Sequence, residues 1–128
     1  MNIRLVEAGA LLHDIGRSRS HDVDHVVRGV EVARELGLPE NLVHIIERHV
    51  GAGIPDEEAK ELGFPDGHYV PESLEEKIVT YADKLIAGHC EVDIEVTISQ
   101  LAVKLGSDHP SIQRLRDLDA EMKKLLAG

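Results

Sequence analysis

Aliphatic residues recur at helical spacing from one end of the chain to the other, and glycines or prolines interrupt the pattern at short intervals. Near the N-terminus, the first apolar stripe consists of Leu5, Ala8, Leu11 and Leu12, and Gly16 follows it. Because residues three or four apart share one face of an α-helix, each stripe predicts a helix with one buried side. No alternation of apolar and polar residues bounded by turns indicates a strand. The sequence therefore predicts an all-α fold, a compact bundle of five to seven helices.

The predicted helix boundaries follow capping and turn residues. The clearest start is Ser73 followed by Glu76, a capping box in which the two residues satisfy each other's backbone N–H groups. Residues 54–72 show little periodicity and predict a short acidic helix followed by an ordered loop. A first helix is expected to end at Gly16, which acts as a stop signal. The further predicted helices cover residues 22–36, 39–49, 75–87, 93–105 and 110–126.

Length and composition limit the classes of function. The 128 residues suffice for one domain with its own core, with a motif-bearing part at about 5–87 and C-terminal helices at about 93–126. The net charge of −10 argues against a surface that binds duplex nucleic acid, although a local phosphate pocket remains compatible with it. No apolar run reaches the length of a membrane span. Cys90 is the single cysteine, so no internal disulfide can form and a cytoplasmic setting is expected.

The pair His13 and Asp14, at the end of the first predicted helix, is the sharpest chemical feature. A carboxylate in this apolar context is costly to bury unless it is paired or bound to a metal. Imidazole and carboxylate groups are common ligands of divalent cations, so the pair suggests a metal site. The alternative is a polar helix end that faces water.

Three more residues offer the same ligand chemistry. Asp83 is an acid in a largely apolar helix, where the alternatives are an ion pair near Lys84 or exposure to solvent. His25 lies among valines four residues after His21, a spacing that can place two ligands on one helix face. His49 precedes a glycine turn that would let a ligand approach. Each histidine taken alone is more typical of a surface or core residue than of a ligand.

The order of these residues resembles the HD-domain superfamily of metal-dependent phosphohydrolases, in its HDIG-bearing branch. The resemblance extends from about residue 5 to residue 86 and implies an α-helical bundle. It rests on the stretch His13-Asp14-Ile15-Gly16, on His25 and His49, and on the run Tyr81-Ala82-Asp83-Lys84.

The resemblance also implies a set of metal ligands. The doublet of the family corresponds to His13 and Asp14, and its distant acid corresponds to Asp83. In members with two ions, two further histidines bind the second ion and the aspartate of the doublet bridges. Here these histidines would be His25 and His49. The implied cofactor is one or two divalent ions, and the ligand types suit Mn, Fe, Ni, Zn or Mg.

The chain departs from the family pattern at one point. The first histidine of the family lies on a helix before the doublet, yet no histidine stands among the 12 residues before His13. The natural chain could start earlier; another residue or a second subunit could complete the site; or metal could bind weakly, or only at the second position. Candidate replacements within the chain are His21, His68 and His89. A missing helix would leave apolar surface uncovered, which favours a homo-oligomer.

The implied function is hydrolysis of a phosphate ester by a metal-activated water. The expected substrate is a nucleotide or another small phosphorylated compound. Asp14 is the expected catalytic residue, and Arg17 is expected to clamp the substrate phosphate, with Arg28 and Lys84 as secondary candidates. One alternative is a non-catalytic domain that binds metal or nucleotide and has an incomplete site. Another is a helical interaction module in which the histidines are incidental.

Overall fold

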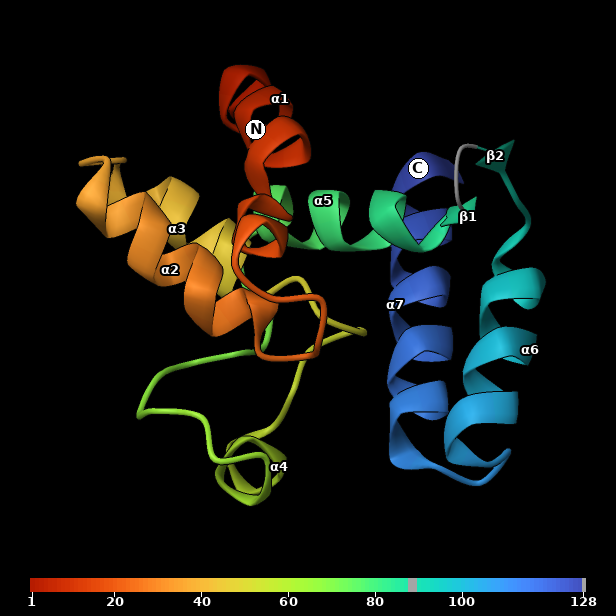
Figure 1. Ribbon diagram of the computed structural model, residues 1–128. Helices are drawn as coiled ribbons and strands as arrows, with labels where there is room; N and C mark the ends of the chain where they lie inside the picture. The colour runs from red at the N-terminus through yellow and green to blue at the C-terminus, as the bar shows by residue number, and fades with distance from the viewer. Residues whose placement is uncertain (88–89, 128) are drawn as a thin grey trace.

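The computed structural model describes residues 1–87 and 90–127, and within these ranges the chain forms seven α-helices, one 3-10 helix and one short hairpin (Figure 1). The helices are α1 (Ile3–Leu12), α2 (His25–Glu35), α3 (Glu40–Glu47), α4 (Asp56–Glu61), α5 (Leu74–Lys84), α6 (Ile94–Leu105) and α7 (Pro110–Ala127). The 3-10 helix is η1 (Ile15–Ser18), and the strands are β1 (Ile86–Ala87) and β2 (Cys90–Glu91). The predicted all-α fold is confirmed.

Two local predictions are wrong. The first helix ends at Leu12 instead of continuing to Gly16, because Gly16 packs against α2 and the chain reaches that position through η1. The helix predicted over 75–87 ends at Lys84, and β1 takes the place of its last turn. There the backbone leaves the helix to pair with β2 in a short antiparallel hairpin, a detail that the all-α prediction did not contain.

Helix α5 connects two groups of packed helices, as Figure 1 shows. On one side, α1, α2 and α3 enclose an aliphatic cluster that includes Val43 and Ile46. On the other side, α6 and α7 pack around a second cluster that includes Ile98 and Leu115, against which Tyr81 of α5 is packed. Among the described residues, every helix is too short or too polar to span a bilayer.

The backbone of η1 lies directly against α2. A Cβ atom on Gly16 would be 1.8 Å from the carbonyl oxygen of His25 and 2.5 Å from the amide nitrogen of Gly29. Only glycine therefore fits at this position. The contact draws the segment after α1 onto the first turns of α2, so that Asp14 and His25 lie near each other.

A buried ion pair joins the end of α3 to the start of α5. The Arg48 guanidinium donates to Glu76 Oε1 at 3.0 Å and to the carbonyl of His68 at 3.1 Å. The backbone N–H of Glu72 donates to the same Glu76 oxygen. Burial opposes the charge of Glu76, but these hydrogen bonds outweigh it and hold the pKa of Glu76 below its usual range. The pair anchors the residue that precedes His49.

Replacement of Gly16 by alanine should destabilise the protein strongly. The new Cβ atom would meet backbone atoms of α2, so we expect Gly16→Ala to lower the free energy of unfolding by about 3 kcal/mol or more. Gly37→Ala is a suitable control, because Gly37 has open space around it and a φ of 70°. It should lose only about 1 kcal/mol for the left-handed backbone. Urea unfolding followed by circular dichroism measures both values, and equal losses would contradict the close contact.

Glu76→Gln should remove a pH-dependent part of the stability. Because the folded-state pKa of Glu76 is depressed, its contribution is present above the unfolded pKa and is lost as the pH falls through the folded pKa. We expect the variant to lose about 2 kcal/mol at pH 7. The difference from wild type should shrink in urea titrations below about pH 4. The control is Glu75→Gln one residue earlier, which leaves the Arg48–Glu76 pair intact and should change the free energy of unfolding at pH 7 by less than about 0.5 kcal/mol.

Candidate metal centre

The five residues proposed as metal ligands come together at one place, although they belong to four distant segments of the chain. They are His13 at the end of α1, Asp14 before η1, His25 at the start of α2, His49 after α3 and Asp83 in the last turn of α5. The close packing of η1 on α2 and of α1 on α5 brings these segments side by side.

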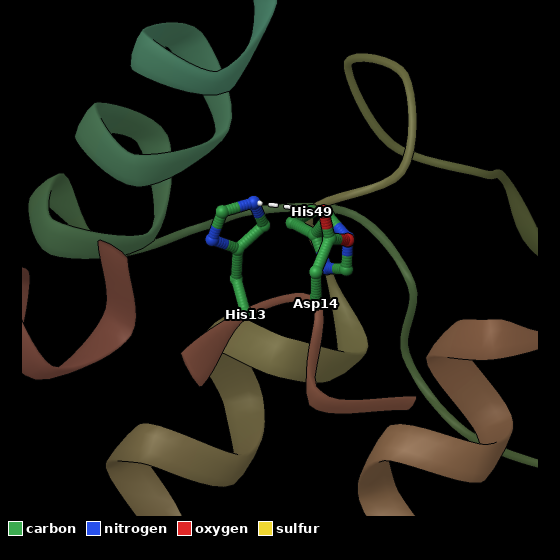
Figure 2. A group of neighbouring side chains, drawn as sticks. All are labelled: His13, Asp14 and His49. Atoms are coloured by element: carbon green, nitrogen blue, oxygen red, sulfur yellow. Dashed lines mark hydrogen bonds and ion pairs between the residues drawn. The ribbon is translucent and has the colours of Figure 1, made fainter. Parts of the chain in front are cut away.

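Asp14 is the centre of the cluster. Its Oδ1 lies 3.2 Å from His25 Nε2 and 3.0 Å from His49 Nε2, and these two nitrogens are 3.1 Å apart. Its Oδ2 lies 3.5 Å from His13 Nε2. Figure 2 shows His13 to one side of Asp14, and ligand atoms of His13, Asp14 and His49 lie within 4.8 Å of one another. Asp14 therefore turns Oδ1 toward His25 and His49 and turns Oδ2 toward His13.

Local backbone carbonyls orient all three imidazoles in the same way. In each ring Nδ1 lies within hydrogen-bond distance of the carbonyl three residues earlier. The partners of His13, His25 and His49 are Ala10 (3.0 Å), Asp22 (3.0 Å) and Ile46 (2.8 Å). A carbonyl only accepts, so Nδ1 carries the proton and Nε2 of the neutral ring turns its lone pair toward the cluster. This arrangement is typical of metal-binding histidines.

The cluster fits a divalent cation. Three Nε2 lone pairs and several carboxylate oxygens face one another, and they repel unless a cation or additional protons lie between them. The His25 and His49 residues are only 4% and 2% exposed. Burial lowers the pKa of His49 despite the Asp14 carboxylate beside its ring, which disfavours an added proton on that ring. Imidazole nitrogens and carboxylate oxygens are ligands of Zn, Mn, Fe and Ni.

Both carboxylates carry negative charge at neutral pH. The imidazoles of His25 and His49, which lie against its Oδ1, hold the pKa of Asp14 well below its usual range. Burial opposes the charge of Asp83, but His13 and Lys84 outweigh it and depress the pKa of Asp83. The pKa of His13 is raised, because Asp83 and Asp14 more than offset the effect of burial. The centre is therefore an anionic cluster lined by imidazoles.

Lys84 extends the cluster on the Asp83 side. Asp83 Oδ1 lies 3.2 Å from His13 Nε2, and its Oδ2 lies 2.7 Å from Lys84 Nζ. The same ammonium donates to the carbonyl of His49 at 3.0 Å. Lys84, a sequence candidate for substrate binding, is thus held within the cluster and also borders a cavity of about 500 Å³.

The two arginine candidates differ in their placement. Arg17 lines a cavity of about 680 Å³ that His25 also lines, and its guanidinium donates to the carbonyl of His21 at 2.6 Å. Arg28 forms an ion pair with Glu31 at 2.8 Å on the surface of α2, and among the described residues it does not line this cavity. Of the two arginine candidates, Arg17 is therefore the one that shares a cavity with a residue of the cluster.

None of the histidines considered as a replacement first ligand joins the group of neighbouring ligand atoms found in the described part of the chain. His21 is exposed and lines the larger cavity. His68 pairs with Glu72 at 2.8 Å. His89 lies outside the described residues.

Sequence reasoning missed the contribution of the C-terminal helices to the site. Residues of α6 and α7 line the larger cavity together with Arg17 and His25: Leu101, Lys104, Leu105, Ser111 and Arg114. No motif marks these residues, because their positions follow from tertiary packing. An amphipathic pattern predicts which face of a helix is buried but not which cavity the face borders.

Comparisons with known proteins give a family and several relatives. The family model described as HD domain matches residues 1–88. An uncharacterized protein of Methanocaldococcus jannaschii is 52% identical over 126 residues, which are 98% of this chain and 75% of that protein. The tRNA (cytidine(56)-2'-O)-methyltransferase of Picrophilus torridus is 42% identical over 124 residues, 95% of this chain and 35% of that enzyme.

A further similarity covers a shorter segment. Ribonuclease Y of Acidothermus cellulolyticus is 52% identical over 48 residues, 36% of this chain and 10% of that protein. The chain therefore spans only about a third of the methyltransferase and a tenth of the ribonuclease. No solved structure matches the chain significantly. Because the family model covers 88 of the 128 residues, the chain belongs to the HD domain family.

Proposed function

We propose that the chain is a metal-dependent phosphohydrolase that acts on a nucleotide or another small phosphate ester. One observation carries the proposal: three imidazoles, each oriented by its own backbone carbonyl, direct Nε2 toward the carboxylates of the cluster. Membership of the HD domain family supports it as well.

Asp14, His25 and His49 would hold the ion, and His13 and Asp83 would complete its surroundings. A bound divalent ion supplies a water molecule of lowered pKa and neutralises charge on a phosphoryl oxygen. The chain's own contribution is to fix the donor atoms before the ion arrives. Burial of His25 and His49 excludes bulk water from one side of the site, which strengthens electrostatic interactions there.

The larger cavity supports a small substrate with an apolar part. Its volume of about 680 Å³ lies in the range of ligand pockets. Arg17 would bind a phosphate, because the bond to the His21 carbonyl positions a guanidinium that has five N–H donors. The aliphatic side chains of Leu101 and Leu105 would contact the organic part of the substrate.

RNA is also a substrate class to test. Two groups of relatives carry names that refer to RNA, the tRNA methyltransferases and ribonuclease Y. The net charge of −10 disfavours binding of a nucleic acid duplex. We therefore propose that a substrate derived from RNA would be a single strand or a free nucleotide. The panel should therefore include an aryl phosphate, nucleoside monophosphates, cyclic nucleotides and a single-stranded oligoribonucleotide. Metal binding without turnover of any compound would favour a non-catalytic regulatory domain instead.

Asp14→Asn should abolish both metal binding and turnover. The substitution removes the charged oxygens that face all three histidines, so we expect at least a tenfold loss of bound metal. Elemental analysis of protein loaded with Mn²⁺ and freed of excess ion by gel filtration measures the content. Asp56→Asn, at the exposed start of α4, is the matched control and should retain metal and activity. Full metal content in the Asp14 variant would contradict the central role of this carboxylate.

Arg17→Ala should weaken substrate binding without loss of metal. Removal of a charge-assisted hydrogen bond corresponds to a rise in KM of about tenfold to a hundredfold, with a smaller effect on kcat. Steady-state kinetics on the best substrate of the panel, together with metal analysis, tests this expectation. The control is Arg34→Ala, which removes an exposed arginine of α2 paired with Glu40. An unchanged KM would show that Arg17 does not contact the phosphate.

A further inference from the structure

Lys84 introduces a fixed positive charge into one half of the metal centre. We propose that this ammonium takes the place of a second metal ion, so that the chain binds one divalent ion, at Asp14, His25 and His49. Lys84 is then a positioning residue and not a substrate clamp. The inference rests on the proposed metal-binding function and specifies how many ions the centre accepts.

The two halves of the centre differ in their partners. In the first half, Asp14 Oδ1 and the Nε2 atoms of His25 and His49 form a triangle with sides of 3.0, 3.1 and 3.2 Å. No lysine or arginine contacts these three atoms within the described residues. Three converging donors of this kind are a ready site for a divalent ion.

In the second half, an internal cation is already in place. The donors there are His13 Nε2, Asp14 Oδ2 and the Asp83 carboxylate. Lys84 Nζ lies 2.7 Å from Asp83 Oδ2, while Asp83 Oδ1 faces His13 at 3.2 Å. Both oxygens of Asp83 are therefore engaged, and its charge is compensated by the ammonium.

The position of Lys84 is determined by several independent contacts. Its side chain is only 12% exposed, and its Nζ donates a second hydrogen bond to the carbonyl of His49. On the backbone side, the Thr97 hydroxyl of α6 donates to the Lys84 carbonyl. An exposed lysine moves freely and can be displaced by a metal ion, but this one is held at both ends.

Electrostatics then favours one ion over two. A divalent ion bound to Asp83 would lie next to an ammonium that cannot move away, and the two like charges would repel in a partly buried site. The ammonium does not contact the donor atoms of the first half, because Lys84 Nζ donates to the His49 backbone carbonyl while His49 Nε2 lies against Asp14. Loss of the lysine charge should therefore open the second half to metal.

The test counts ions in four proteins: wild type, Lys84→Met, Lys84→Arg and Lys77→Met. Each is stripped with a chelator, saturated with Mn²⁺ and freed of excess ion. Elemental analysis then gives ions per chain, and electron paramagnetic resonance distinguishes isolated from coupled Mn²⁺. We expect about one isolated ion in wild type and about two coupled ions in Lys84→Met. Lys84→Arg keeps the charge and should stay at one. Lys77→Met, on the same helix in an ion pair with Glu121, should do the same.

The outcomes separate this inference from the proposed function. Two ions in wild type would overturn the inference and leave metal-dependent hydrolysis standing. No bound ion in wild type would overturn both. A folded Lys84→Met protein that still binds one ion would also overturn the inference. If Lys84→Met does not fold, the ion counts of wild type and Lys84→Arg test the inference: one ion in each supports it, and two ions in either overturn it.

Discussion

The contact between η1 and the first turns of α2 is the constraint on which the candidate metal centre depends. Gly16 lets two backbones approach so closely that no side chain fits between them. This approach carries Asp14 to the ring of His25, while α3 delivers His49 to the same carboxylate oxygen. A larger residue at this position would push η1 away from α2 and so separate Asp14 from His25. The precision of the centre is therefore set by backbone packing at a neighbouring glycine.

Helical periodicity and the order of the ligand residues were readable from the sequence, because both depend on local spacing. The stripes of aliphatic residues predicted the helices, and the capping box predicted the start of α5 at Ser73 and Leu74. Chain reversals were less predictable. The end of α1 and the hairpin after Lys84 depend on contacts with α2 and on the pairing of Ala87 with Cys90, which local propensity does not contain.

The candidate site divides in the same way. Residue types with known ligand chemistry at characteristic places could be predicted, and the structure brings all five together. The side chains that surround these five residues could not be predicted from the sequence. The pairing of Lys84 with Asp83, the ion pairs that keep Arg28 at the surface, and the cavity wall from α6 all arise from tertiary contacts. A charged residue next to a ligand in sequence can face the ligand, a substrate or water, and only packing decides among these.

The cavity wall formed by α6 and α7 lies beyond residues 1–88, the part of the chain that matches the family model. The donors of the candidate metal centre and the α6 and α7 residues that line the adjoining cavity thus belong to separate stretches of the chain. Mutations in the second stretch can reshape the cavity while every donor atom remains in place. Such a division would let the compounds that fit the cavity change while the candidate donor side chains stay the same.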